Sequence, residues 1–200
     1  MIKCLKIIWR GMVPENPVLV LALGLCSTLA VTIKFENALF MGIMVGFTTI
    51  ITSLITSCLR HSIPFKFRLM SYMIIIVTSV ITVEQLLKAY YPDMARELGP
   101  YVGLIVTNCI VMGRMESFAS SHKVYETFFD ALGISIGYAL VLLAIASIRE
   151  LIGFGTIWRL ALLPEEYIPC KVFSSPAGAF IVFALLLFVV NWLRSFGRRN

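Results

Sequence analysis

The chain has 200 residues, of which 59% are hydrophobic and only 14% are charged, and its mean hydropathy is +0.90. A soluble domain has roughly 45–50% apolar and about 25% charged residues, so this composition excludes a soluble enzyme and predicts an integral membrane protein. The net charge of +6 does not indicate nucleic-acid binding, because the basic residues lie between apolar runs, where they act as topology signals facing anionic lipid headgroups.

Six apolar runs follow one another along the chain, at residues 18–33, 38–59, 69–90, 101–113, 129–148 and 176–193. A hydrocarbon core about 30 Å thick requires about 20 helical residues, and the first and fourth runs are too short for it. No signal peptide is expected, because the N-terminal region leads into the first run without a small-residue cleavage site. The pattern predicts an all-α integral membrane protein with six transmembrane helices in a single membrane domain, residues 1–200, with helices 1 and 4 interrupted.

The two short runs share a spacing. Pro17 precedes Cys26 by nine residues, and Pro100 precedes Cys109 by nine residues. Each proline can open a helix, since its missing N–H would have no intrahelical partner in the first turn. Each run then becomes polar at its cysteine, which lies in Cys-Ser-Thr in the first run and in Thr-Asn-Cys in the fourth.

This match relates the two halves of the chain by a shift of about 83 residues. With three helices in each half, the second half (about 98–195) enters the membrane from the opposite side to the first half (about 14–92), which predicts an inverted repeat. Interrupted helices at corresponding positions of two such halves indicate a site at the membrane midplane. The alternative is two short, tilted helices with incidental cysteines.

The distribution of lysine and arginine predicts the orientation. One side of the membrane holds both termini and eleven of the 17 basic residues, namely Lys3, Lys6, Arg10, Arg60, Lys66, Arg68, Arg114, Lys123, Arg194, Arg198 and Arg199. The other six lie on the opposite side. Because lysine and arginine are in excess on the cytoplasmic side of membrane proteins, both termini are expected in the cytoplasm.

Cysteines at two interrupted helices suggest an iron–sulfur centre. If the helices meet at the repeat axis, Cys26 and Cys109 approach each other, and the unpaired backbone N–H groups beside them suit an anionic ligand. A [2Fe–2S] cluster normally takes four cysteines, so a partner, most simply a homologous six-helix subunit, would supply the other two. A disulfide between Cys26 and Cys109 is the chemical alternative. Cys4, Cys58 and Cys170 have no counterpart in the repeat and are predicted to be structural.

Four stretches of the sequence resemble a known family: LGLCSTLAVT (23–32), VEQLLKAY (83–90), YVGLIVTNCIVMGR (101–114) and PAGAF (176–180). They are similar to the six-span membrane subunits of one respiratory family. This family includes NqrD of the sodium-translocating NADH:quinone oxidoreductase and RnfE of the Rnf complex. The resemblance extends over essentially the entire chain.

The resemblance implies that Cys26 and Cys109 supply half of an intramembrane [2Fe–2S] cluster, which a homologous sister subunit completes. It implies a multi-subunit sodium pump in a bacterial cell inner membrane, where electrons pass between a cytoplasmic NADH-oxidising side and a flavin subunit outside. Ser27 and Glu84 resemble NqrD of the quinone reductase, and RnfE of the ferredoxin:NAD oxidoreductase is the alternative. The sequence has no G-x-G-x-x-G motif, P-loop or flavin-attachment motif, so the chain is expected to bind neither NAD nor flavin and to have no catalytic residue of its own.

Two acidic residues are candidates for an ion path. Glu84 and Lys88 lie four residues apart, which is an ordinary helix-stabilising spacing, but an ionisable group inside a membrane is also a functional-site candidate. Asp130 opens the fifth run, where a carboxylate also complements a helix N-terminus. The resemblance favours both acids as sodium-path residues. Arg114 and Arg149 follow apolar runs and are expected to anchor them at the membrane interface.

Two other classes of protein fit part of this pattern. A secondary transporter with a site at the midplane also uses inverted repeats and broken helices, but it has no need of matched cysteines at both breaks. A scaffold subunit without a cofactor is the third interpretation. The loop 155–173 matches neither of the two related subunits, and no role is predicted for it.

Overall fold

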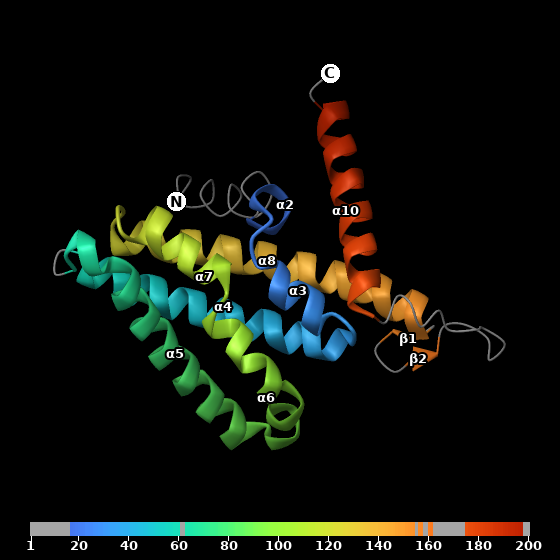
Figure 1. Ribbon diagram of the computed structural model, residues 1–200, viewed down its shortest axis with the longest axis horizontal. Helices are drawn as coiled ribbons and strands as arrows, with labels where there is room; N and C mark the ends of the chain where they lie inside the picture. Colours follow the sequence, from blue (N-terminus) through green and yellow to red (C-terminus); the bar gives the residue numbers. More distant parts are fainter. Residues whose placement is uncertain (1–16, 61–62, 155, 158–159, 162–174, 198–200) are drawn as a thin grey trace.

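The computed structural model describes residues 17–60, 63–154, 156–157, 160–161 and 175–197. Cys4, Cys170, the two ends of the chain and most of the loop 155–173 lie outside these residues. The described part is almost entirely helical (Figure 1). Its strands are β1 (Thr156–Ile157) and β2 (Leu160–Ala161), which pair in antiparallel orientation. The prediction of a helical protein is confirmed.

The helices overlap the predicted runs, but α6 begins before the fourth run and α8 extends beyond the fifth at both ends. In chain order they are α2 (Pro17–Leu21), α3 (Leu25–Val31), α4 (Phe35–Leu59), the 3-10 helix η1 (Phe65–Phe67), α5 (Arg68–Tyr90), α6 (Pro92–Val106), α7 (Cys109–Arg114), the π-helix η2 (Met115–Ala119), α8 (Val124–Phe154) and α10 (Pro176–Gly197).

Four stretches in the described part are long and apolar enough to cross a membrane: Phe35–Leu59, Phe65–Tyr90, Gly99–Ala119 and Val124–Gly153. The first predicted run is interrupted, as expected, and is divided between the short helices α2 and α3. The last contains a shorter apolar stretch, Ala177–Trp192. The described structure thus supports a multi-pass membrane protein with four candidate spans, while six spans in an inverted repeat stay a prediction.

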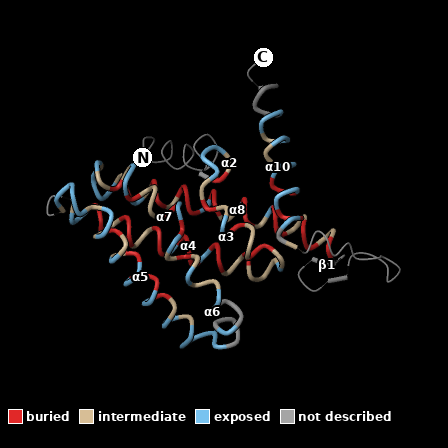
Figure 2. The backbone as a smooth tube through the Cα atoms, viewed as in Figure 1, coloured by how far each residue is buried: buried red, intermediate tan, exposed pale blue. Residues whose placement is uncertain are grey.

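Helices α4 and α8 form the centre of the molecule and run antiparallel to each other. A Cβ atom added at Gly42 would lie 3.2 Å from Ala139 Cβ, and one added at Gly46 would lie 3.2 Å from Ser135 Cβ. Ser135 Oγ also donates to the backbone oxygen of Gly46 over 3.3 Å. Small residues at four-residue spacing allow this close approach, which is how membrane helices gain packing energy where lipid provides no hydrophobic driving force. Figure 2 shows the buried residues gathered along these two helices.

The C-terminal end of α8 holds the corner between α3 and α4. Arg149, only 2% exposed, donates to the backbone oxygen of Leu29 (3.1 Å), to Thr32 Oγ1 (2.7 Å) and to the backbone oxygen of Ser175 (3.1 Å). Arg149, which the sequence suggested as an interfacial anchor, thus binds groups of the protein itself. Its charge lies inside the protein, where the end of α3 and the residue before α10 supply carbonyl oxygens.

The neighbouring residue on α8 acts on the other side of the same corner. Glu150 Oε2 accepts a hydrogen bond of 2.6 Å from the backbone N–H of Phe35, the first residue of α4. A carboxylate at this position also complements the positive end of the helix dipole. Arg149 and Glu150 thus provide hydrogen-bond partners for a backbone carbonyl oxygen near the end of α3 and for the backbone N–H at the start of α4.

The remaining helices surround this pair. Helix α5 packs against α4 and α6, and α10 packs against α8 and α3 before it projects from the bundle (Figure 1). Large apolar side chains on α5 and α10, such as Ile74, Leu185 and Phe188, are exposed. This distribution suits helices whose outer faces meet lipid or other membrane proteins.

The close contact between α4 and α8 predicts the effect of a bulky side chain at Gly46. Gly46→Leu should lower the thermal unfolding midpoint in detergent, because overpacking a close contact costs about 1–3 kcal/mol. Gly103→Leu is the matched control, since a Cβ atom at Gly103 has no neighbour within 4 Å. Equal unfolding midpoints for the two variants would contradict this account of the α4–α8 contact.

Candidate cysteine site at two helix breaks

The first break separates α2 from α3. Ala22 and Gly24 both have positive φ angles, 52° and 75°, and residues in the left-handed region cannot continue a right-handed helix. The carbonyl oxygen of Gly24 is not left unpaired. It accepts hydrogen bonds from Ser27 Oγ at 3.0 Å and from Thr28 Oγ1 at 2.8 Å. Cys26 is the second residue of α3, and its side chain is exposed.

The second break separates α6 from α7. Asn108 has extended backbone angles, φ −69° and ψ 116°, and its Oδ1 accepts a hydrogen bond of 3.0 Å from the backbone N–H of Ile110. This is an ordinary N-cap, in which a side-chain oxygen satisfies a first-turn donor of the new helix. Cys109 is the first residue of α7, and it is exposed as well.

The two prolines have different outcomes. Pro17 is the first described residue of α2, and because residues 1–16 lie outside the described part, its role in opening a helix stays a prediction. Pro100 lies inside α6, which begins at Pro92, so the expectation that Pro100 opens a helix is wrong. Pro92 itself occupies the first-turn position that a proline favours.

The two breaks are packed directly against each other. Asn108 Nδ2 donates to Ser27 Oγ over 3.3 Å, although the two residues are 81 positions apart. A Cβ atom at Gly24 would lie only 2.5 Å from Ile110 Cδ1, so the first break is in close contact with the Ile110 side chain of α7. The structure therefore brings the residues next to Cys26 and Cys109 to one place.

A tyrosine from the central helix α8 completes this junction. The hydroxyls of Tyr138 and Ser27 share a hydrogen bond of 2.7 Å, and Ser27, Asn108 and Tyr138 are all fully buried. Sequence reasoning missed Tyr138, because nothing in its neighbourhood sets it apart from other aromatic residues on an apolar helix. We call Ser27, Asn108 and Tyr138 the junction triad.

The donor atoms at this site are two thiols. Cys26, Cys58 and Cys109 are free cysteines, so Cys26 and Cys109 do not form the disulfide that was the chemical alternative. Across the residues that the structure describes, no group of three or more His, Cys, Asp or Glu residues is placed to hold a metal ion. A metal centre at Cys26 and Cys109 would therefore need further ligands from outside the described residues.

The first candidate ion-path residue, Glu84, is part of an ion pair. Its Oε1 lies 2.6 Å from Lys88 Nζ, and the Glu84 side chain is 23% exposed. A pair at this spacing stabilises a helix by about 0.2–0.5 kcal/mol. This geometry is that of an ordinary helix-stabilising ion pair, but the Glu84 carboxylate remains partly accessible.

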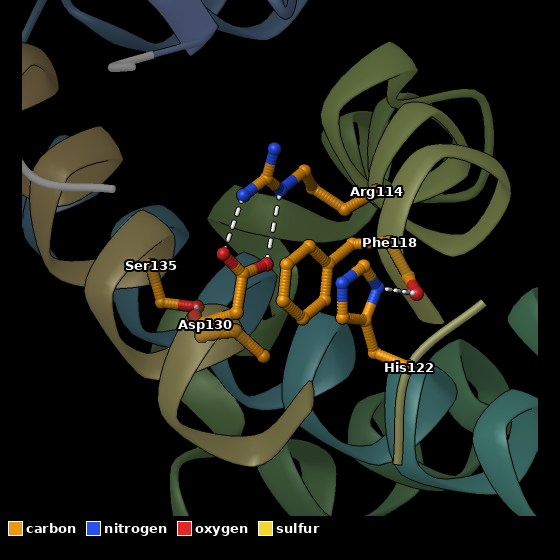
Figure 3. Close-up of polar contacts among 6 residues, drawn as sticks. Arg114, Phe118, His122, Asp130 and Ser135 are labelled. Atoms are coloured by element: carbon orange, nitrogen blue, oxygen red, sulfur yellow. Dashed lines mark hydrogen bonds and ion pairs between the residues drawn. The ribbon is translucent and has the colours of Figure 1, made fainter. Parts of the chain in front are cut away.

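The second candidate, Asp130, is paired with Arg114. The guanidinium holds both carboxylate oxygens, with Nε 3.1 Å from Oδ2 and Nη2 hydrogen-bonded to Oδ1. Figure 3 shows Arg114 pointing to Asp130, with the Phe118 ring stacked on His122 at a centroid distance of 3.8 Å. Asp130 follows the start of α8, at Val124, by six residues, so it does not open the helix as expected. Arg114, which the sequence suggested as an interfacial anchor, is only 14% exposed and is paired within the protein.

The sequence matches known membrane proteins over most of its length. Residues 4–187 match the family described as "Rnf-Nqr subunit, membrane protein". The chain is 38% identical to RnfE of the Na(+)-translocating ferredoxin:NAD(+) oxidoreductase complex of Acetobacterium woodii, over 94% of this chain and 96% of that protein. It is 38% identical to NqrD of the Na(+)-translocating NADH-quinone reductase of Tolumonas auensis (94% and 90%), and 43% identical to that of Pseudoalteromonas atlantica (80% and 76%).

The packing of the first break predicts the effect of a methyl group at residue 24. Gly24→Ala should lower the thermal unfolding midpoint, because a left-handed alanine costs about 1–2 kcal/mol and its Cβ atom overlaps Ile110. It should also raise the rate at which maleimide labels Cys26, since the break is displaced. Gly103→Ala, in open space, is the control and should be neutral or slightly stabilising. The account fails if Gly24→Ala behaves like Gly103→Ala in both measurements.

Proposed function

The chain belongs to the Rnf-Nqr family of membrane subunits, and on that premise we propose that it is a membrane subunit of a sodium-translocating redox complex and carries half of an intramembrane [2Fe–2S] cluster. One observation supports the cluster above all others. Cys26 and Cys109 are exposed, free thiols, each in the first turn of a helix that follows a break. The residues beside them are hydrogen-bonded to each other.

The residues present fit such a cluster as one half of its ligands. A [2Fe–2S] cluster normally takes four cysteine thiolates, and this chain offers two of them at one junction. Because both thiols are exposed at the surface of this chain, a homologous six-helix sister subunit can approach and supply the other two. When bound, the cluster would accept and donate single electrons within the membrane.

The residues of this chain have distinct parts in that role. Cys26 and Cys109 would bind iron as thiolates. Ser27 and Asn108, both fully buried, satisfy the backbone of the breaks and keep water from it. The chain itself would bind neither NAD nor flavin, and other subunits of the complex would oxidise and reduce the soluble substrates.

Within the family, we propose the role of NqrD in an NADH:quinone oxidoreductase. Ser27 after the first cysteine and the acidic Glu84 support this assignment through their resemblance to that protein. The role of RnfE in a ferredoxin:NAD oxidoreductase is the second candidate, supported by the relative in Acetobacterium woodii that matches 94% of this chain. The acceptor that the purified complex reduces, quinone or NAD, distinguishes the two.

The proposed setting is a bacterial cell inner membrane with both termini in the cytoplasm. The excess of lysine and arginine on the side of the termini supports this orientation. The outer faces of α5 and α10, with their exposed apolar residues, would contact lipid and partner subunits. A secondary transporter or a scaffold subunit would contain no iron, so the iron content separates these classes from the proposed one.

The cluster assignment predicts the effect of losing either thiol. Cys26→Ser and Cys109→Ser should each remove the [2Fe–2S] EPR signal of the reduced complex, together with about two iron atoms and two acid-labile sulfides per complex, because one thiolate cannot hold half a cluster. Assembly of the complex should persist. Cys58→Ser is the matched control, since Cys58 is also a free, exposed thiol. Full iron content in both site variants would refute the assignment.

The ion-path assignment predicts a difference between the two members of the Glu84–Lys88 pair. Glu84→Gln and Lys88→Gln both break the ion pair, but only the first removes a carboxylate that could bind sodium. We expect Glu84→Gln to raise the sodium concentration for half-maximal turnover by about tenfold, equivalent to about 1.4 kcal/mol of binding free energy. Lys88→Gln keeps the carboxylate and removes its competing cation, so it should lower this concentration or leave it unchanged, and it should not raise it.

Both variants are compared in complexes with normal iron content, so that a lost cluster is not mistaken for an altered ion path. If the two variants shift the sodium dependence equally, or not at all, Glu84 is a structural residue.

A further inference from the structure

We infer that Tyr138 is a positioning residue for the two cysteines, and that it fixes them through the hydrogen bonds of the junction triad. This inference rests on the proposed function, because it concerns how Cys26 and Cys109 are held for a shared cluster. Tyr138 acts on the cysteines through Ser27. Its hydroxyl reaches Ser27 Oγ, and Ser27 is next to Cys26 in the chain.

The donor and the acceptor can be assigned at the Asn108 end of the triad. Asn108 Oδ1 accepts from the backbone N–H of Ile110, so its Nδ2 faces Ser27 and donates to Ser27 Oγ over 3.3 Å. This pattern assigns the orientation of the amide. Ser27 Oγ therefore has three neighbours: the Asn108 amide, the Tyr138 hydroxyl at 2.7 Å and the carbonyl oxygen of Gly24 at 3.0 Å.

The triad connects three separate parts of the chain. Ser27 lies in the first turn of α3, Asn108 caps α7, and Tyr138 lies on α8. Cys26 precedes Ser27 and Cys109 follows Asn108, so the Cα atom of each cysteine lies about 3.8 Å from the Cα atom of a member of the triad. A displacement of Ser27 relative to Asn108 must displace Cys26 relative to Cys109.

Helix α8 is the rigid element that carries Tyr138 and so fixes the positions of the two cysteines. Ala139, next to Tyr138, packs against Gly42, and Ser135, one turn earlier, packs against Gly46. The two cysteines, by contrast, lie on the short helices α3 and α7, each of which follows non-helical residues. A site gains precision when its ligands are held by side chains on a rigid helix, and a looseness of about 1 Å is enough to impair it.

Burial makes the triad sensitive to a single atom. Ser27, Asn108 and Tyr138 are fully buried, so water cannot replace a lost hydroxyl. Tyr138→Phe removes one oxygen and leaves the ring in place. Without the hydroxyl, we expect Ser27 to adopt more than one position. The distance between Cys26 and Cys109 should then cover a wider range.

The first test measures that distance in the full-length chain without a cluster. Spin labels are attached to Cys26 and Cys109 after Cys4, Cys58 and Cys170 have been changed to serine. Tyr138→Phe should broaden the distance distribution between the labels or add a second population. Tyr72→Phe is the matched control, because Tyr72 is also buried, at 1% exposure, but lies on α5. An unchanged distribution in Tyr138→Phe, or an equal broadening in Tyr72→Phe, would overturn the inference.

A second variant separates positioning from a general loss of stability. Ser27→Ala removes the atom through which Tyr138 acts, so it should broaden the distribution on its own. In the Ser27→Ala background, adding Tyr138→Phe should then have no further effect, as a double-mutant cycle requires of residues that act as a unit. Additive broadening would show that Tyr138 acts by another route and would overturn the inference.

A measurement on the assembled complex distinguishes this inference from the proposed function. Tyr138→Phe should change the EPR line shape and shift the midpoint potential of the cluster, whereas Tyr72→Phe should leave both as in the wild type. A wild-type complex without iron would refute the proposed function. A wild-type cluster that is unaffected by Tyr138→Phe would refute the positioning role alone.

Discussion

The close packing of α4 against α8 is the contact on which the rest of the structure depends. Because Gly42 and Gly46 of α4 have no side chains, the small side chains of Ala139 and Ser135 on α8 approach the α4 backbone directly. From this base, α8 contributes a side chain to two irregular parts of the described chain. Tyr138 reaches the helix breaks, and Arg149 reaches the corner between α3 and α4. Irregular backbone inside a membrane is stable only where the protein buries it, and α8 provides that burial.

The polar residues that interrupt the apolar runs have a common physical purpose. A broken helix exposes carbonyl and N–H groups that hydrocarbon cannot satisfy. At the first break, Ser27 and Thr28 donate to the carbonyl oxygen of Gly24, and at the second, Asn108 accepts from the N–H of Ile110. The same residues join the breaks to each other, so local satisfaction and long-range packing are achieved by one set of side chains. The cysteines are left at the surface, where a second chain can reach them.

The two acidic candidates for an ion path differ in their surroundings. Asp130 is buried and holds a guanidinium with both oxygens, so a cation at this carboxylate would have to displace Arg114. Glu84 is partly exposed and pairs with a flexible lysine one turn along α5. An ion can therefore approach Glu84 with less rearrangement than it can approach Asp130. This contrast follows from burial and from the bidentate geometry of arginine, and not from the presence of the carboxylates alone.

The sequence by itself determined the class of the protein and the places where its helices fail. Its apolar composition requires a membrane, and Cys-Ser-Thr and Thr-Asn-Cys lie at the two breaks that the structure contains. Only the tertiary structure decided that Tyr138 joins the breaks, that Arg149 is buried, and that Asp130 pairs with Arg114. The reason is physical: composition and local capping act over a few residues, whereas Tyr138 and Ser27 are 111 positions apart. Contacts at such separations depend on how the helices cross, and no local pattern records that geometry.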